Sequence, residues 1–177
     1  AQGKGKSTFI RHLLPPELKD YYRNGMIIPE NNNHLLQLSS CLLINLDEFD
    51  TLSPERMQNL KSLITQDVVN ERKVYDIQNY TYIRRASFIA STNNPHCMPA
   101  VKENRRILFS TLLNIDYHTP VNHEGIYAQA YALYRQGFQY WYENEEITFL
   151  NNRNEAFRQK DPIEENLFFY FRAARQN

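Results

Sequence analysis

Cysteine is scarce in this sequence, and the two that occur, Cys41 and Cys97, lie far apart. This usage is typical of a reduced chain and argues against a disulfide scaffold of the secreted type. Long apolar runs are also missing, since none approaches the ~18 residues that a membrane-spanning helix needs. We therefore expect a cytoplasmic protein with no membrane partner.

An excess of charge of either sign is absent as well. Lys and Arg together number 20, as do Asp and Glu, so the formal net charge is zero. No overall positive field favours nucleic acid, and any such contact must come from a local cluster of cations. The chain has 177 residues, enough for one compact domain with a small appendage.

Apolar runs alternate with helical patterns over the first two thirds of the chain. Buried strands are expected at residues 42–46, 86–91 and 107–113. Helices are expected at residues 8–14, 34–39 and 54–68, and a helical turn at residues 17–23. Alternating residues over 73–83 predict a β-hairpin. The pattern predicts an α/β fold over residues 1–120, with helices flanking a parallel sheet.

Residues 121–177 have helical patterns, which predict a C-terminal helical appendage. Asn122 can cap a helix, and Asp161 with Glu164 resembles the capping box of another. The first of these helices carries an aromatic stripe, namely Tyr127, Tyr131, Tyr134, Phe138 and Trp141. We expect this stripe to pack in the core, with a stacking platform for bases as the alternative.

A phosphate-loop pattern opens the chain. Its candidate residues are Gly3, Lys4, Gly5, Lys6, Ser7 and Thr8. Glycines let backbone N–H groups turn towards phosphates, Lys6 would reach the β- and γ-phosphates, and the Ser7 hydroxyl would bind Mg²⁺. The opening Gly of the motif would fall one residue before Ala1. We therefore expect a longer protein, in which a preceding strand and this Gly complete the motif.

Polar residues follow two of the expected strands. Asp47 and Glu48 come directly after residues 42–46, where Asp47 could hold Mg²⁺ and Glu48 could polarise the attacking water. Asn93 follows residues 86–91 and suits a sensor of the γ-phosphate. The alternatives are a surface loop that caps the next helix for the acidic pair, and an ordinary Asn-Pro turn for Asn93.

The motifs together resemble a known family. They occur in the order Gly-Lys-Gly-Lys-Ser-Thr, Leu-Ile-Asn-Leu-Asp-Glu-Phe-Asp, Arg-Arg-Ala-Ser-Phe-Ile-Ala-Ser-Thr-Asn and Asn-Arg-Arg-Ile-Leu. Over residues 1–142 the chain is similar to the virulence-associated protein E family, whose ATPase core resembles superfamily 3 helicases of the AAA+ class. Family members occur on phages and other mobile elements, often with primase modules.

The resemblance implies an ATPase that uses ATP and Mg²⁺. Residues 3–8 would be Walker A, Asp47 and Glu48 Walker B, and Asn93 the sensor. Arg105 and Arg106 stand where such enzymes place an arginine that reaches the nucleotide of a neighbouring subunit in a ring. Single-stranded or forked DNA would be the other partner, and a primase module is possible.

The expected hairpin would contact that DNA. Its cations are Arg72, Lys73, Arg84 and Arg85, and tyrosines are interleaved with them. Cations hold phosphates and aromatic rings stack on bases, as the equivalent hairpin does in superfamily 3 helicases. The alternatives are a solvated edge hairpin for all four and, for Arg84 and Arg85, a role in ATP binding or a subunit contact.

The leading interpretation is an ATP-hydrolysing, helicase-like domain that acts on DNA in the replication of a mobile element. The main alternative is an ATP-dependent switch or assembly protein without unwinding activity, or an inactive remnant. A small-molecule kinase shares the phosphate loop, but the Asp-Glu pair at a strand end disfavours it. His96 with Cys97 could form half of a metal site, although no second pair has zinc spacing.

Overall fold

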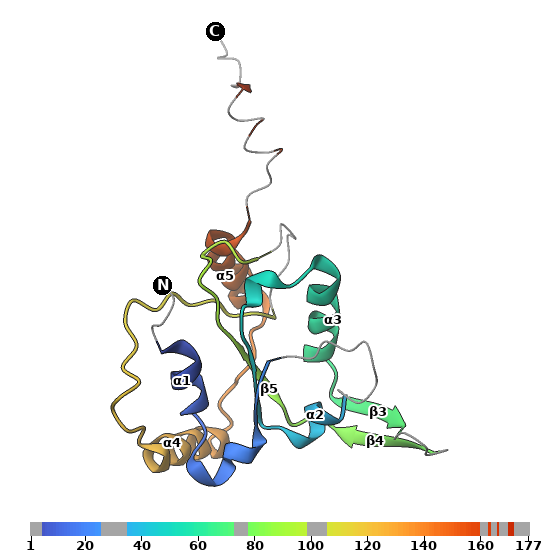
Figure 1. Cartoon of the computed structure of the whole chain (residues 1–177), viewed down its shortest axis with the longest axis vertical. Helices are drawn as coiled ribbons and strands as arrows, with labels where there is room; N and C mark the ends of the chain where they lie inside the picture. Colours follow the sequence, from blue (N-terminus) through green and yellow to red (C-terminus); the bar gives the residue numbers. More distant parts are fainter. Residues whose placement is uncertain are drawn as a thin grey trace. The chain divides into compact units, whose positions relative to one another are not determined.

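The computed structural model describes residues 5–25, 35–72, 78–98 and 106–159, with 163, 166, 170 and 171 (Figure 1). The chain forms two compact units. The first comprises Ala1–Asn93 with Thr111–Trp141, and the second Asn94–Ser110 with Tyr142–Asn177. The boundary at residue 120 stays a prediction. The helix expected after Asp161 lies largely outside the described residues.

A three-stranded parallel sheet forms the centre of the first unit. It contains β1 (Tyr22–Asn24), β2 (Leu43–Leu46) and β5 (Ser87–Ala90), in the order β1-β2-β5. The apolar run of β2 explains its central place, since Ile44 and Leu46 are buried. The predicted α/β fold with a parallel sheet is thus confirmed at this level. Strand β1 falls where a helical turn was expected, and only the preceding η1 (Pro16–Tyr21) is helical.

Short helices accompany these strands. In the sequence, α1 (Lys6–Arg11) precedes β1, α2 (Leu35–Ser40) lies between β1 and β2, and α3 (Pro54–Ile64) lies between β2 and β5. Ser53 caps the N-terminus of α3, because its hydroxyl accepts a hydrogen bond from Arg56 N–H at 3.3 Å. The prediction that α3 extends to Val68 is wrong. The helix ends at Ile64, and the β-branched pair Val68-Val69 begins a strand.

That strand belongs to a hairpin, but one placed earlier than predicted. β3 (Val68–Arg72) pairs antiparallel with β4 (Asn79–Ile83), with Val68 opposite Ile83 and Arg72 opposite Asn79 (Figure 1). The first strand therefore precedes the range 73–83 that alternation predicted. Residues 73–77 lie outside the described part.

The strand predicted at residues 107–113 does not form. Residues 107–113 are irregular, and Leu108, Leu112 and Leu113 are exposed. In the second unit, Phe109 stacks on Phe157 with ring centroids 5.1 Å apart, and Ile107 C=O accepts from Asn154 Nδ2 at 2.8 Å. The apolar residues at the start of this run thus pack against the end of α5 (Asn144–Asn154) and η4 (Glu155–Phe157) instead of a sheet.

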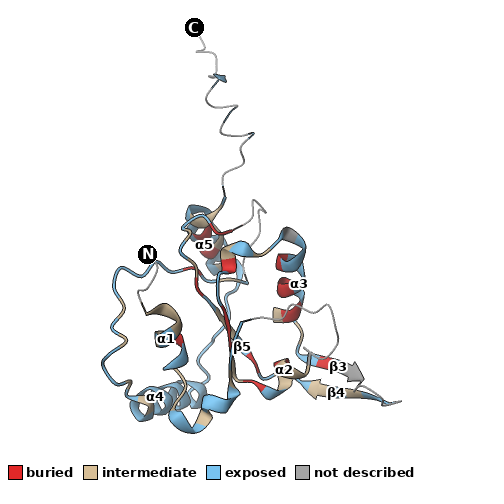
Figure 2. Cartoon of the chain, viewed as in Figure 1, coloured by how far each residue is buried: buried red, intermediate tan, exposed pale blue. Residues whose placement is uncertain are grey.

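The aromatic helix forms, but its aromatic residues are not core. Asn122 caps α4 (His123–Arg135) as predicted, because its Oδ1 accepts from Gly125 N–H at 3.0 Å. No residue of α4 is buried, and the helix is exposed along its length (Figure 2). The helix ends at Arg135, and Gly137 adopts a φ of 74°, so Phe138 and Trp141 of the expected stripe lie beyond the helix. The expectation of core packing is therefore wrong.

Polar contacts attach α4 to the end of α1. The Tyr127 hydroxyl donates to Leu13 C=O at 3.3 Å, and His123 Nε2 lies 2.7 Å from His12 C=O. Such contacts leave the aromatic faces in solvent. Across the described residues, no helix is long and apolar enough to cross a bilayer.

Candidate functional site

The candidate site lies at the edge of the sheet where β2 and β5 end, beside the start of α1. Both strands are parallel, so the residues that follow each of them emerge at the same edge. Gly5 precedes α1 with a φ of 75°, a conformation that glycine adopts without steric cost. A Cβ at this position would also collide with the ring of Tyr117. The turn that delivers Lys6 and Ser7 to the site therefore requires glycine.

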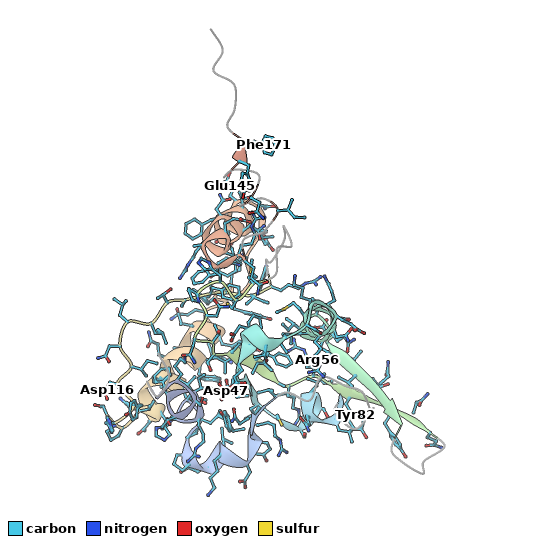
Figure 3. The ribbon with its side chains drawn as sticks, turned by 45° about the horizontal axis from the view of Figure 1, so that its top comes forward. Asp47, Arg56, Tyr82, Asp116, Glu145 and Phe171 are labelled. Atoms are coloured by element: carbon cyan, nitrogen blue, oxygen red, sulfur yellow. The ribbon has the colours of Figure 1, made fainter. Side chains whose placement is uncertain are left out.

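Asp47 is the centre of the site (Figure 3). One carboxylate oxygen, Oδ2, accepts from the Ser7 hydroxyl at 3.1 Å. The other, Oδ1, accepts from the Ser91 hydroxyl at 2.8 Å. The carboxylate that follows β2 is thus held by one hydroxyl from α1 and one from the residue after β5.

Lys6 makes the second link across the site. Its ammonium donates to Thr92 C=O at 2.9 Å and to Asn93 Oδ1 at 2.5 Å. Lys6 and Asn93 are 87 residues apart in the sequence, yet the fold places their polar atoms in contact. The structure therefore brings together Lys6 of the predicted phosphate loop and the predicted sensor Asn93.

The loop after β2 presents Glu48 in an unusual backbone conformation. Glu48 has φ 53° and ψ 47°, the left-handed region that residues other than glycine rarely adopt, and its side chain is exposed. The two residues after Glu48 anchor the loop. Phe49 is buried, and Asp50 Oδ1 accepts a hydrogen bond from the Thr92 hydroxyl at 2.5 Å. These anchors keep the Glu48 carboxylate in solvent beside Asp47.

A polar seam borders the site on the side of β1. Asn45 is fully buried, and its amide donates to Asn24 Oδ1 at 2.7 Å. Burial raises the pKa of the Tyr22 hydroxyl, while a hydrogen bond with the Asn45 side chain opposes the rise and the charge of Asp47 adds to it. The negative charge of Asp47, which follows β2, therefore disfavours ionisation of Tyr22 on β1.

The oxygen atoms around Asp47 suit a hard divalent cation. A carboxylate and a hydroxyl stand 3.1 Å apart, which is the donor chemistry that Mg²⁺ prefers. Ser7 and Asp47 are therefore the residues that would hold it. The described residues contain no group of three His, Cys, Asp or Glu side chains that could hold a metal, at this site or elsewhere. Cys97 is buried and His96 is exposed, which gives the half-site hypothesis no support.

The remaining predicted site residues are described only in part. Thr8 is exposed on α1, and Gly3, Lys4 and Arg105 lie outside the described residues. Arg106 is exposed and belongs to the second unit. The first unit alone therefore assembles Lys6, Ser7, Asp47, Glu48 and Asn93.

The hairpin cations differ from one another. Arg84 donates through Nε to Gln66 C=O and through Nη1 to Ala86 C=O, each at 2.6 Å. These bonds engage the guanidinium within the protein and favour a structural role for it. Arg85 is exposed, Arg72 ends β3, and Lys73 lies outside the described residues.

Sequence reasoning missed the residues that support the cluster. Ser91 and Thr92 both donate to acidic side chains of the β2 loop, and Tyr117 lies against Gly5. A signal existed for the first two, because Ser-Thr-Asn stands at the end of an expected strand. No pattern in the sequence relates Tyr117 to the phosphate loop.

Comparison with known proteins assigns a family to the chain. The family profile of the virulence-associated protein E-like domain matches residues 1–159, which include every residue of the cluster. A search of curated proteins gives no match. A match over so much of the sequence assigns the family: the chain belongs to the virulence-associated protein E-like domain family.

Proposed function

We propose that the chain is an ATP-hydrolysing module of the P-loop class that acts on DNA during the replication of a phage or another mobile element. The observation that carries the proposal is the convergence of Lys6, Ser7, Asp47 and Asn93 from three separate segments. Each has the chemistry that phosphoryl transfer from ATP requires, and the family is one in which such modules occur.

Each residue has a defined part in the proposed reaction. The Lys6 ammonium binds the β- and γ-phosphates, and Asn93 contacts the γ-phosphate or the water. Glu48 accepts a proton from the water while the water oxygen attacks the γ-phosphorus. The bond to the β–γ bridging oxygen breaks, and ADP and phosphate leave. Ser7 and Asp47 would hold Mg²⁺, which would supply positive charge beside the phosphate oxygens.

Glu48 suits the role of general base for a structural reason. Its carboxylate is exposed and has no hydrogen bond among those described for the site, whereas Asp47 accepts two from hydroxyl groups. The acid that is held in place suits a metal ligand, and its exposed neighbour can reach a water molecule. The metal ligand Asp47 and the proton acceptor Glu48 of the proposed reaction are thus adjacent in the sequence.

The Glu48→Gln variant tests the proposal. An amide cannot accept the proton, so ATP binding should persist while turnover falls on the order of 100-fold or more. Binding is measured with a fluorescent ATP analogue and turnover by phosphate release. Glu55→Gln, an exposed glutamate in the first turn of α3, is the matched control and should behave as the parent. Parent-like turnover of Glu48→Gln would refute its role.

Stimulation by DNA separates a DNA motor from an ATP-dependent assembly protein. The proposal predicts that single-stranded or forked DNA raises the rate of phosphate release. A hydrolysis rate that is indifferent to every DNA added would favour the switch or assembly alternative.

A further inference from the structure

The two oxygens of Asp47 are held in different ways. Ser7, which donates to Oδ2, is half-buried at the start of a short helix. Ser91, which donates to Oδ1, is 7% exposed and directly follows a strand. The bond to Ser91 is also shorter, 2.8 Å against 3.1 Å. Ser91 is therefore the more firmly placed of the two partners.

The backbone of Ser91 is fixed on both sides of Asp47. Its N–H donates to Leu46 C=O at 3.1 Å, and its C=O accepts from Phe49 N–H at 3.2 Å. Leu46 and Phe49 flank the acidic pair, and both are buried. The Ser91 hydroxyl thus lies on a backbone that is bonded before and after the carboxylate it contacts.

This arrangement has a consequence for the orientation of the carboxylate. A carboxylate rotates about the bond between Cβ and Cγ, and its terminal torsion is broad. A hydrogen bond to one oxygen restricts that rotation and so directs the other oxygen. With Oδ1 held by Ser91, Oδ2 points towards Ser7. Such outer partners of metal-ligating carboxylates typically change metal affinity 10- to 100-fold when they are removed.

We propose that Ser91 is a positioning residue, which holds Oδ1 of Asp47 so that Oδ2 and the Ser7 hydroxyl together receive the divalent cation of the bound nucleotide. The inference rests on the proposed function, because it assigns to Asp47 the role of metal ligand. Ser91 itself touches neither the nucleotide nor the cation. Its effect passes through Asp47 alone.

The test measures binding of Mn²⁺ to the complex of the protein with ADP, by electron paramagnetic resonance. Ser91→Ala removes the donor and should raise the dissociation constant of Mn²⁺ on the order of 10- to 100-fold. Affinity for ADP in the presence of EDTA should stay as in the parent, because no metal is involved there. A merely structural role of Ser91 would change both affinities together.

Ser87→Ala is the matched control, because Ser87 is an exposed serine at the start of the same strand. It should bind Mn²⁺ as the parent does. If Ser91→Ala fails to fold, Ser91→Cys keeps the volume of the side chain but offers only a weak donor. The Ser91→Cys variant should also have a higher dissociation constant for Mn²⁺ than the parent.

The outcomes are distinct. Parent-like Mn²⁺ affinity in the Ser91 variant that folds would overturn the inference and leave the proposed function intact. Equal losses of Mn²⁺ and metal-free ADP affinity would overturn it too, because Ser91 would then support the fold of the site. A parent protein that binds no ADP with or without Mn²⁺ would overturn the proposed function and this inference with it.

Discussion

Glu48 combines an exposed carboxylate with a left-handed backbone conformation. The exposed carboxylate suits the proposed proton transfer, whereas the backbone conformation lowers the stability of the fold. Its φ of 53° costs stability, because the Cβ crowds the neighbouring carbonyl. Residues held in such conformations are often found at functional sites, where the surrounding structure maintains them. Here the buried Phe49 and the bond between Asp50 and Thr92 provide that support.

A comparison of two substitutions measures this strain. Glu48→Gly removes the Cβ, whereas Glu48→Ala removes the carboxylate and keeps the Cβ. We expect the Gly variant to have a free energy of unfolding about 1 kcal/mol higher than the Ala variant, from urea denaturation. The reverse order, which is usual where φ is negative, would show that position 48 is unstrained in solution.

At the scale of single elements, the hairpin β3–β4 is the feature for which we propose a separate role, the binding of DNA. Its strands pair over five residues each, and Tyr80 and Tyr82 lie on one of them with ring centroids 6.3 Å apart. Tyr82 is labelled in Figure 3. Aromatic rings beside cations are the usual means of binding single-stranded nucleic acid.

The salt dependence of DNA binding tests this role. Replacing Arg72 and Lys73 with Ala should weaken binding of single-stranded DNA and flatten the slope of log K against log salt by about 1.4, at ~0.7 for each phosphate contact. Fluorescence anisotropy at several salt concentrations measures the slope. The control replaces Lys19 and Arg23, two exposed cations outside the hairpin. An unchanged slope would mean that the hairpin charges are merely solvated.

The elements that sequence could predict are those whose local pattern agrees with their packing. The apolar run of β2 is long enough to require burial, and Ser53 with Pro54 marks the start of α3. Strand β1 gave no such signal. Its residues Tyr-Arg-Asn are polar or amphipathic, and it is a strand because its backbone pairs with β2.

The aromatic helix α4 is an element whose sequence pattern predicted the wrong packing. Periodic aromatic residues predict a buried face, yet α4 meets the rest of its unit through the polar groups of Tyr127 and His123. For the site, two of the motifs supply Ser7 and Asp47, and the structure places their side chains 3.1 Å apart. The contribution of Ser91 depends on strand register, which motif order does not specify.

At the scale of the whole molecule, we propose that the active form contains more than one subunit. An arginine that reaches the nucleotide of a neighbour would complete the site in a head-to-tail ring. Arg105 and Arg106 follow the sensor in the chain, and Arg106 is exposed in the second unit. Activity should therefore rise more than linearly with protein concentration.

Mixing two inactive variants tests this arrangement. An Arg105→Ala/Arg106→Ala variant should lose on the order of 10³-fold or more in turnover, as removal of an arginine finger does. A Lys6→Ala variant with intact arginines should partly restore activity when the two are mixed. Rescue cannot arise from misfolding, which makes it the informative result. Full activity of the double variant, or no rescue where rings form, would contradict a trans-acting arginine.

The central claim is that Lys6 and Asp47 form a site for a nucleotide and its divalent cation, and one binding measurement tests it most directly. Titration calorimetry of the protein with ATP and Mg²⁺ should give a saturable isotherm. Lys6→Ala should weaken binding on the order of 10- to 100-fold, because a charged hydrogen-bonding group is lost. Lys19→Ala, an exposed lysine of η1, should bind as the parent does. Equal affinity of the Lys6→Ala variant and the parent would contradict the account.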